Sequence, residues 1–323
     1  MAGESESFPE LTDEFALVAE TAAEGGVADD ALPRVRRSWV NVPAGGHVSG
    51  VFWGEGPPEL LFLHDIGGSA RAWDAVALAA GRPAVAIDLP GHGRSDWRRD
   101  GRYEPARLAP ALAEAIRSFA PRTRLIVGAG LGADTALALR RRHARLVPAL
   151  AVVGTLPGTA SGRAGQRPRP ERFAGRRDAL AALAVRRPEA SEAALRREVL
   201  YELAQDPDGS WAWRHHGGSQ PPPADPAAAG GPDGEALWEE LGQLGPAAVI
   251  IRGDQAGGLT AADLARLEER APDAAVLTVP GAGRDITAHP AALAAALTQL
   301  LTQPPAAGLL AGRLVITQSK GQP

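Results

Sequence analysis

The sequence contains no cysteine, and this absence removes several kinds of chemistry at once. Without cysteine the chain cannot form a disulfide, supply a thiolate nucleophile or bind zinc through sulfur. It also has no apolar run that approaches the roughly 20 residues needed to cross a bilayer. The N-terminus lacks the basic, apolar and small-residue order of a secretory signal. We therefore expect a soluble, cytoplasmic protein.

Lysine is nearly absent, so positive charge comes almost entirely from arginine, and Lys320 is the one exception. The formal net charge is −4, yet residues 1–33 hold nine acids and no basic residue, whereas residues 163–198 hold ten arginines against five acids. A nearly neutral chain with an acidic arm gives no reason to expect nucleic acid binding. We expect a small-molecule substrate or ligand as the partner, no membrane partner, and a monomer or homodimer.

Short apolar segments alternate with helical patterns over most of the chain. Strands are predicted at 59–64, 84–88, 124–129, 149–154, 247–253 and 274–280, and helices at 69–80, 105–119, 131–143, 260–271 and 289–302. Nearly continuous apolar strands separated by helices predict an α/β fold with a mostly parallel central sheet and helices on both faces. An acidic amphipathic helix within 7–26 and a hairpin over 38–54 are predicted before this alternation.

About ninety residues interrupt the alternation after the strand that ends near Gly154. They contain Arg-rich helical pieces and the stretch SQPPPADPAAAGGPDG, which is too rich in proline and glycine for regular structure. We interpret them as a cap over the carboxyl edge of the sheet, followed by a loop. The predicted organisation is an acidic N-terminal extension at 1–36, a core in two parts at 37–155 and 233–303, the cap and loop at 156–232, and a C-terminal tail at 304–323.

Four stretches fall at the carboxyl ends of predicted strands, where open α/β sheets build their sites. They are LHDIGGSARAW, DLPGHGRSDW, GAGLGA and GAGRDITAHP. In this order and spacing the chain resembles the α/β-hydrolase superfamily from about Ser38 to Leu301, and the DGSWAWR segment is similar to one in uncharacterised actinobacterial members. The resemblance implies an α/β-hydrolase fold with an inserted helical cap and a nucleophile raised on a sharp strand-to-helix turn.

The residues that would form the catalytic triad are replaced in this sequence. Gly130 stands where the resemblance implies the nucleophile, so no acyl-enzyme can form there. Arg284 stands where it implies the general base, and arginine cannot accept a proton. Ala256 and Gly154 occupy the two common positions of the acid, although Asp254 lies nearby. Hydrolysis by the ordinary triad is therefore not expected.

A further departure lies in HDIGG, where Asp65 follows His64 in place of the glycine that the family carries. This loop normally contributes a backbone N–H to an oxyanion hole, which a carboxylate would oppose unless it points away or is paired. Arg284 could be its partner, because both loops face the same edge of the sheet. Such a pair could be purely structural, or it could act in catalysis or substrate binding.

Our leading hypothesis is a cofactor-independent enzyme that catalyses a non-hydrolytic reaction on a small organic molecule in specialised metabolism. C–C bond formation, cyclisation and elimination are the reactions considered. Asp65 or Asp254 would move a proton, Arg284 would stabilise negative charge, and the pocket would orient the substrate.

Two other hypotheses stay open. The protein could be a catalytically inactive binding or sensor protein, or a hydrolase with relocated catalytic residues, for instance Ser69 or Ser95 acting with His289. Asp88 and His92 of the DLPGHGRSD stretch are expected to fix their loop rather than to react.

The pocket is expected to be lined by the same loops and by the cap. The predicted substrate-binding residues are His64, Ile66, Trp73, Gly130, Leu131, Trp211, Trp213 and Asp285. For Trp211 and Trp213 the alternative is packing of the cap against the core, and for His64 it is holding its own loop. No metal is expected at His215 and His216, which have no acid or third histidine at helical spacing, and no cofactor is expected because GAGLGAD lacks the full dinucleotide fingerprint.

Overall fold

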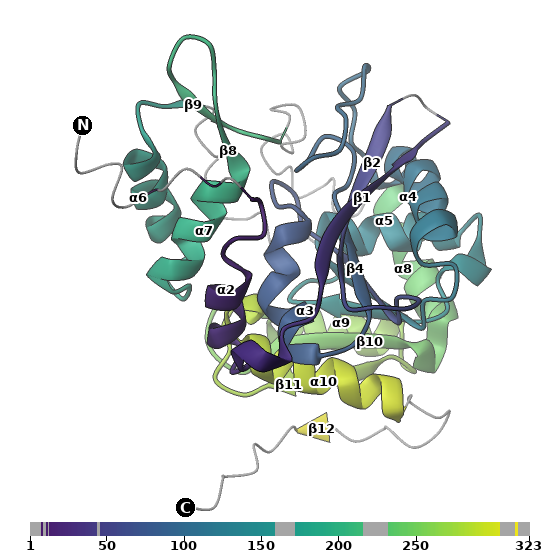
Figure 1. The fold of residues 1–323 in the computed structure, drawn as a ribbon. Coiled ribbons are helices and arrows are strands. Elements are labelled where there is room, and N and C mark those ends of the chain that lie inside the picture. Colours follow the sequence, from purple (N-terminus) through teal and green to yellow (C-terminus); the bar gives the residue numbers. More distant parts are fainter. Residues whose placement is uncertain are drawn as a thin grey trace, which may run out of the picture.

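A nine-stranded sheet runs through the centre of the protein, in the order β1-β2-β4-β3-β5-β6-β10-β11-β12 (Figure 1). The computed structural model describes residues 8, 11, 13–43, 46–158, 172–215, 232–303 and 314–315. Its strands are β1 (Val35–Asn41), β2 (His47–Trp53), β3 (Leu60–Leu63), β4 (Ala84–Ile87), β5 (Leu125–Ala129), β6 (Leu150–Val153), β10 (Ala248–Gly253), β11 (Ala275–Val279) and β12 (Leu314–Val315). The β1–β2 and β2–β4 pairs are antiparallel and every other pair in this sheet is parallel. The predicted mostly parallel sheet is thus confirmed.

Helices cover both faces of this sheet, and the side chains of β3 show why. Leu61 and Leu63 belong to the buried cluster that includes α4 and α5, whereas Leu60 and Phe62 belong to the cluster that includes α3 and α10. Successive side chains of a strand point to opposite faces, so a strand that is apolar throughout needs a cover on each side. All four residues of β3 are buried.

The helices of the core lie close to their predicted positions. The predicted ones are α3 (Asp74–Ala80), α4 (Pro105–Phe119), α5 (Leu131–Arg140), α9 (Ala261–Arg270) and α10 (Pro290–Thr302), whereas α8 (Pro232–Leu244) was not predicted. The α4 helix spans the predicted residues 105–119, because Pro105 occupies its first turn, where no N–H partner is needed. None of the helices that the structure describes is long and apolar enough to cross a membrane.

Residues 172–215, which we call the cap lobe, form a small layer beside the core (Figure 1). The cap lobe contains α6 (Arg176–Arg186), α7 (Glu192–Glu202) and a three-stranded sheet of β7 (Arg172–Phe173), β9 (Trp211–Trp213) and β8 (Leu203–Gln205). The sequence predicted helices here, and the small sheet is an addition to that prediction. The Pro- and Gly-rich stretch lies outside the described residues except for its last three, which begin α8, and so does nearly all of the C-terminal tail.

The acidic helix of the N-terminal segment, α2 (Val18–Glu24), lies against the cap lobe. Its Glu20 carboxylate pairs with Arg196 and Arg197 of α7, each at 2.9 Å, and Glu24 pairs with Arg197 as well. The Arg197 side chain is only 6% exposed, and these two carboxylates compensate its buried positive charge. The acidic N-terminal charge and the Arg-rich cap charge noted in the sequence therefore neutralise each other across this contact.

Removing both carboxylates with Glu20→Gln and Glu24→Gln should lower the free energy of unfolding by about 2 kcal/mol, because a nearly buried cation is left without its acidic partners. Urea unfolding of the full chain measures this change. Adding Arg197→Met should recover most of the loss, since the apolar stem is kept and the unpaired charge is gone. The exposed acids of the neighbouring turn supply a matched control, Asp29→Asn with Asp30→Asn, and an equal loss in that control would contradict the assignment.

Candidate functional site

The turn between β5 and α5 has the sharp geometry that the sequence predicted, with Gly130 at its tip. Gly130 adopts φ +44° and ψ −114°, a region that favours glycine. The flanking glycines are needed for close packing: a Cβ on Gly128 would lie 2.7 Å from the Ala133 backbone, and one on Gly132 would lie 2.6 Å from the Leu63 carbonyl oxygen. The turn is therefore intact although its nucleophile is absent.

The carboxylate of Asp65 fills the space at this tip. Its Oδ1 accepts hydrogen bonds from the backbone N–H groups of Ile66 at 2.7 Å and of Leu131 at 2.8 Å. A Cβ built on Gly130 would lie 1.8 Å from the same oxygen. In α/β hydrolases the N–H after the nucleophile and one from the β3 loop bind the oxyanion. Asp65 thus occupies the positions of both a nucleophile side chain and an oxyanion.

The three residues predicted to be catalytic are not brought together. Asp65 is bound to backbone N–H groups, and the described residues show no ion pair between its side chain and Arg284. Arg284 is exposed. Asp254 is exposed too, and its Oδ1 accepts from the Gly281 N–H at 2.8 Å and from the Gln255 side chain at 2.9 Å, so it holds a surface turn.

The residues predicted to bind substrate are dispersed as well. Trp73 stacks on Phe62 with ring centroids 5.1 Å apart inside the core, and Trp213 packs edge-on against Phe173 within the cap lobe. The Asp285 carboxylate forms an ion pair with the Arg187 guanidinium at 2.7 Å. Of these predicted residues, Trp211 alone lines the cavity described below.

His64 holds its own loop, which was the alternative considered for it. Its Nε2 accepts from the Leu89 N–H at 3.0 Å, so its Nδ1 donates to the Asp65 carbonyl oxygen at 2.7 Å. Burial lowers the pKa of this histidine, which fits the neutral ring that these two bonds require. Neither ring nitrogen is left for a ligand.

The fit of Asp65 against Gly130 makes a direct prediction. Gly130→Ser should destabilise the protein by about 3 kcal/mol, because the new side chain takes up a disfavoured φ and collides with the Asp65 carboxylate. Asp65→Gly should relieve the collision, so the double variant should be more stable than the sum of the two single changes by more than about 1 kcal/mol. Denaturant unfolding of the four proteins in the cycle measures this coupling. Combining Gly130→Ser with Asp254→Gly provides the control, which should be additive; additivity with Asp65→Gly would refute the contact.

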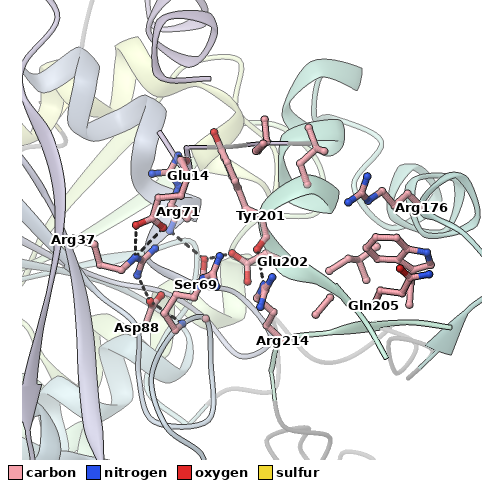
Figure 2. Close-up of a pocket in the computed structure, with 17 residues that line it drawn as sticks. Glu14, Arg37, Ser69, Arg71, Asp88, Arg176, Tyr201, Glu202, Gln205 and Arg214 are labelled. Carbon is pink, nitrogen blue, oxygen red and sulfur yellow. Dashed lines mark hydrogen bonds and ion pairs between the residues drawn. The ribbon is translucent and has the colours of Figure 1, made fainter. Parts of the chain in front are cut away.

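A cavity of about 560 Å³ lies between the cap lobe and the core (Figure 2). The loops after β3 and β4, strand β1, the N-terminal segment and the cap lobe all contribute to its walls. Its polar lining includes Glu14, Arg37, Ser69, Arg71, Asp88, Arg94, Arg176, Tyr201, Glu202, Gln205 and Arg214. This volume lies in the range typical of small-molecule sites.

Asp88 fixes the core side of this cavity, as the sequence suggested for its loop. Its carboxylate accepts from the Arg37 guanidinium at 2.6 Å, from the Ala70 N–H at 2.7 Å and from the Arg94 N–H at 3.1 Å. Burial disfavours its ionised form, but Arg37 and the hydrogen bonds outweigh burial and lower its pKa. Glu14 pairs with the same guanidinium at 3.0 Å, so Arg37 lies between two carboxylates.

Ser69 and Glu202 meet inside the cavity. The Ser69 hydroxyl donates to Oε1 of Glu202, and Ser69 also begins the short helix η2 (Ala70–Trp73) by accepting from the Arg71 N–H at 3.1 Å. Burial raises the pKa of Glu202 to about 7, the negative charge of Asp88 adds to the rise, and the Ser69 bond opposes it. A hydroxyl is thus held against a carboxyl group that ionises near neutral pH.

Sequence reasoning named Ser69 but paired it with His289, and it missed Glu202. His289 precedes α10 and does not line the cavity. Ser95, the other serine considered, donates to the Asp88 carbonyl oxygen at 2.6 Å within its loop. No sequence motif identifies Glu202 as a functional residue. An acid at the end of an Arg-rich helix would be predicted to lie on the surface. Its role depends on how the cap lobe packs on the loop after β3.

No group of three or more histidine and acidic side chains within the described ranges is placed to hold a metal ion. His215 is described and buried, whereas His216 lies outside those ranges.

Comparisons with known proteins agree with this architecture. A sequence model of the Alpha/beta hydrolase family matches residues 60–296. The chain belongs to the alpha/beta hydrolase family. It is 36% identical to esterase Rv0045c of Mycobacterium tuberculosis over 278 residues, which covers 81% of this chain and 87% of that relative.

Solved structures of family members superpose on the chain. A structure of the M. tuberculosis esterase Rv0045c gives a TM-score of 0.75 at 32% identity, covering 91% of this chain and 100% of that one. The thioesterase domain from the curacin biosynthetic pathway, at a TM-score of 0.68 and 21% identity over 83% of this chain and 99% of that one, shares the fold alone.

These relatives correct the function expected from the sequence. We predicted a non-hydrolytic enzyme that acts in C–C bond formation, cyclisation or elimination. That prediction is wrong, because the relative that aligns with 81% of this chain is named an esterase, which points to hydrolysis. The error came from the turn between β5 and α5 around Gly130, which we call the elbow. The loss of its nucleophile was taken to mean the loss of hydrolysis altogether, although the family resemblance covers most of the chain.

The raised pKa of Glu202 makes stability depend on pH. The folded protein holds this proton up to about pH 7, whereas the unfolded chain releases it near the ordinary value of 4.5. The folded state therefore binds more protons between these values, and stability should fall as pH rises through this window, by on the order of 3 kcal/mol. Asp74, whose burial raises its pKa to about 6 although Arg71 opposes the rise, adds a similar fall at lower pH.

Glu202→Gln should therefore flatten the loss of stability between pH 5 and pH 8, because its amide does not titrate and can still accept from Ser69. Guanidinium unfolding at the two pH values measures it. Gln205→Ala, which changes another residue of the cavity lining that carries no ionisable group, is the control and should keep the parent's pH dependence. An unchanged pH dependence in Glu202→Gln would show that Glu202 ionises normally.

Proposed function

We propose that the protein is a hydrolase of small esters that uses Ser69 as its nucleophile and Glu202 as its general base. The observation that carries the proposal is the hydrogen bond from the Ser69 hydroxyl to the buried Glu202 carboxyl group inside the cavity between cap lobe and core. The esterase relative supports the reaction class, since it aligns with most of this chain.

The elbow cannot supply this chemistry in the present sequence. Gly130 has no nucleophilic atom, and the Asp65 carboxylate already accepts from the two N–H groups that would bind an oxyanion. Ester hydrolysis through an acyl-serine needs a hydroxyl next to a base. Ser69 and Glu202 meet that need from a neighbouring wall.

The ionisation of Glu202 suits the role of base. A general base works best when its pKa is near the working pH, and burial raises that of Glu202 to about 7. Arg214 lines the cavity beside Glu202: its backbone N–H donates to the Glu202 carbonyl oxygen at 2.8 Å, and its side-chain Nε donates to the Tyr201 carbonyl oxygen at 3.1 Å (Figure 2). Its positive charge is placed to favour negative charge that develops on the ester oxygen.

The reaction follows from these positions. Glu202 takes the Ser69 proton as Oγ bonds to the ester carbonyl carbon, and it returns that proton to the alcohol as the carbon–oxygen bond breaks. Water then attacks the acyl-Ser69, losing a proton to Glu202, and the acid product leaves as Oγ regains its proton. The net change is one ester and one water converted to one acid and one alcohol.

Replacing Ser69 tests the proposal directly. Ser69→Asn keeps a side chain that can begin η2 but has no nucleophile, and it should lower kcat for 4-nitrophenyl butyrate by about 1000-fold or more. Glu202→Gln should lower kcat by 100- to 1000-fold. The parent's kcat/KM should rise with pH through about 7, and Glu202→Gln should lose that rise.

Labelling identifies the nucleophile independently. A fluorophosphonate should modify Ser69 in the parent, as mapped by mass spectrometry of peptides, and should fail to label Ser69→Asn. Ser210→Ala, which changes a half-buried serine just before β9 that does not line the cavity, should behave as the parent. Equal labelling of the parent and Ser69→Asn, or a parent that hydrolyses no ester, would overturn the proposal.

A further inference from the structure

We propose that the same cavity recognises a second, anionic group on the substrate, a carboxylate or a phosphate, through the guanidinium of Arg71. This inference rests on the proposed function for the position of the reacting ester, and it assigns the substrate class. The ligand would be a small ester with negative charge at its other end.

Arg71 is a buried cation with unused hydrogen-bond donors. Its side chain is 5% exposed and it lines the cavity. Its Nη2 is engaged, at 2.9 Å from the Asp74 carboxylate and 3.3 Å from the Glu14 carbonyl oxygen. Its Nε and Nη1 are buried with no hydrogen-bond partner among the described residues. Leaving a charged donor unpaired in the interior is costly, so an acceptor at this position would be strongly bound.

The guanidinium is held in place before any ligand arrives. It lies over the Tyr201 ring at 4.1 Å and over the Phe15 ring at 5.0 Å. Aromatic rings on a guanidinium fix its plane without using its N–H donors. Arg71 is therefore oriented by contacts that leave it able to donate, as an anion site requires.

The charge of the surrounding wall also favours an anion. Arg37 lies between Glu14 and Asp88, so these three groups together carry one negative charge, which the other arginines must outweigh. Arg94 and Arg214 line the same cavity. Against them stands Glu202, whose pKa of about 7 leaves it partly protonated near neutral pH. Five arginines and three acids line the cavity in all, so its charged lining favours an anion.

The position of Arg71 relative to Ser69 fits recognition of the substrate rather than a purely structural role. The two residues share the first turn of η2, where the Arg71 N–H bonds the Ser69 hydroxyl (Figure 2). An anion bound by the side chain of Arg71 would hold its ester within the same cavity, near the hydroxyl that attacks it. Such anchoring lowers the entropic cost of reaching the reactive geometry.

Binding without turnover tests the site first. Glutarate and inorganic phosphate, titrated into the full chain by calorimetry, represent the carboxylate and phosphate forms of the ligand, and the uncharged glutaramide is the control. We expect at least one anion to bind and glutaramide not to bind. Competition between the two anions shows which of them the site prefers.

Variants assign that binding to Arg71. Arg71→Met combined with Asp74→Asn keeps the apolar stem and avoids an unpaired buried acid, and it should weaken anion binding by about 10- to 100-fold. Arg71→Lys should retain part of it. Arg82→Met, which removes a surface arginine paired with Glu59, should bind as the parent.

Kinetics connect the site to substrate choice. The parent should have a KM at least tenfold lower for mono-(4-nitrophenyl) adipate than for its methyl ester, and the Arg71→Met, Asp74→Asn protein should lose this preference. No anion binding by the parent, or equal binding by that variant, would overturn the inference.

The two proposals can fail separately. Anion binding that depends on Arg71 in a protein that hydrolyses neither ester would support the site and refute the hydrolase. Hydrolysis that depends on Ser69 without any preference for the anionic ester would do the reverse.

Discussion

The buried carboxylate of Asp88 joins the segments from which the cavity is built. It accepts hydrogen bonds from Arg37 on β1, from Ser49 on β2, from the first N–H of η2 and from the loop after β4. Each of these donors comes from a different part of the chain, so the carboxylate fixes their relative positions. Ser69 directly precedes η2, and its orientation toward the cap lobe follows from this anchoring.

Asp65 explains how the elbow can be retained without its usual chemistry. A sharp turn with two inward N–H groups needs an acceptor when no substrate oxyanion is bound, because buried donors are costly to leave unpaired. Here the chain supplies its own acceptor in Asp65 Oδ1. The absence of a Cβ at Gly130 is what makes room for it. Asp65 and Gly130 are therefore physically linked. The Asp65 carboxylate fits because Gly130 has no Cβ, and a larger residue at position 130 would collide with it.

The fold could be predicted from the sequence because its signals are local. The apolar runs of β3 and β5, the proline that begins α4 and the glycines around Gly130 each specify their own conformation. The cavity could not be predicted in the same way. Glu202 and Arg71 belong to the site because the cap lobe packs on the loop after β3, a contact between residues more than a hundred positions apart. The small sheet of the cap lobe was missed for a related reason, since its strands are two or three residues long.

The N-terminal segment lines the cavity and also binds the cap lobe through ion pairs. Glu14 lines the cavity and pairs with Arg37, while Glu20 and Glu24 hold α7 through arginines. These acidic contacts are partly open to solvent, so dissolved salt screens them, whereas the fully buried Asp88 is screened far less. Ionic strength therefore acts unequally on the two sides of the site. Salt weakens the contacts of Glu14, Glu20 and Glu24, whereas the Asp88 hydrogen bonds that position the loop of Ser69 are retained.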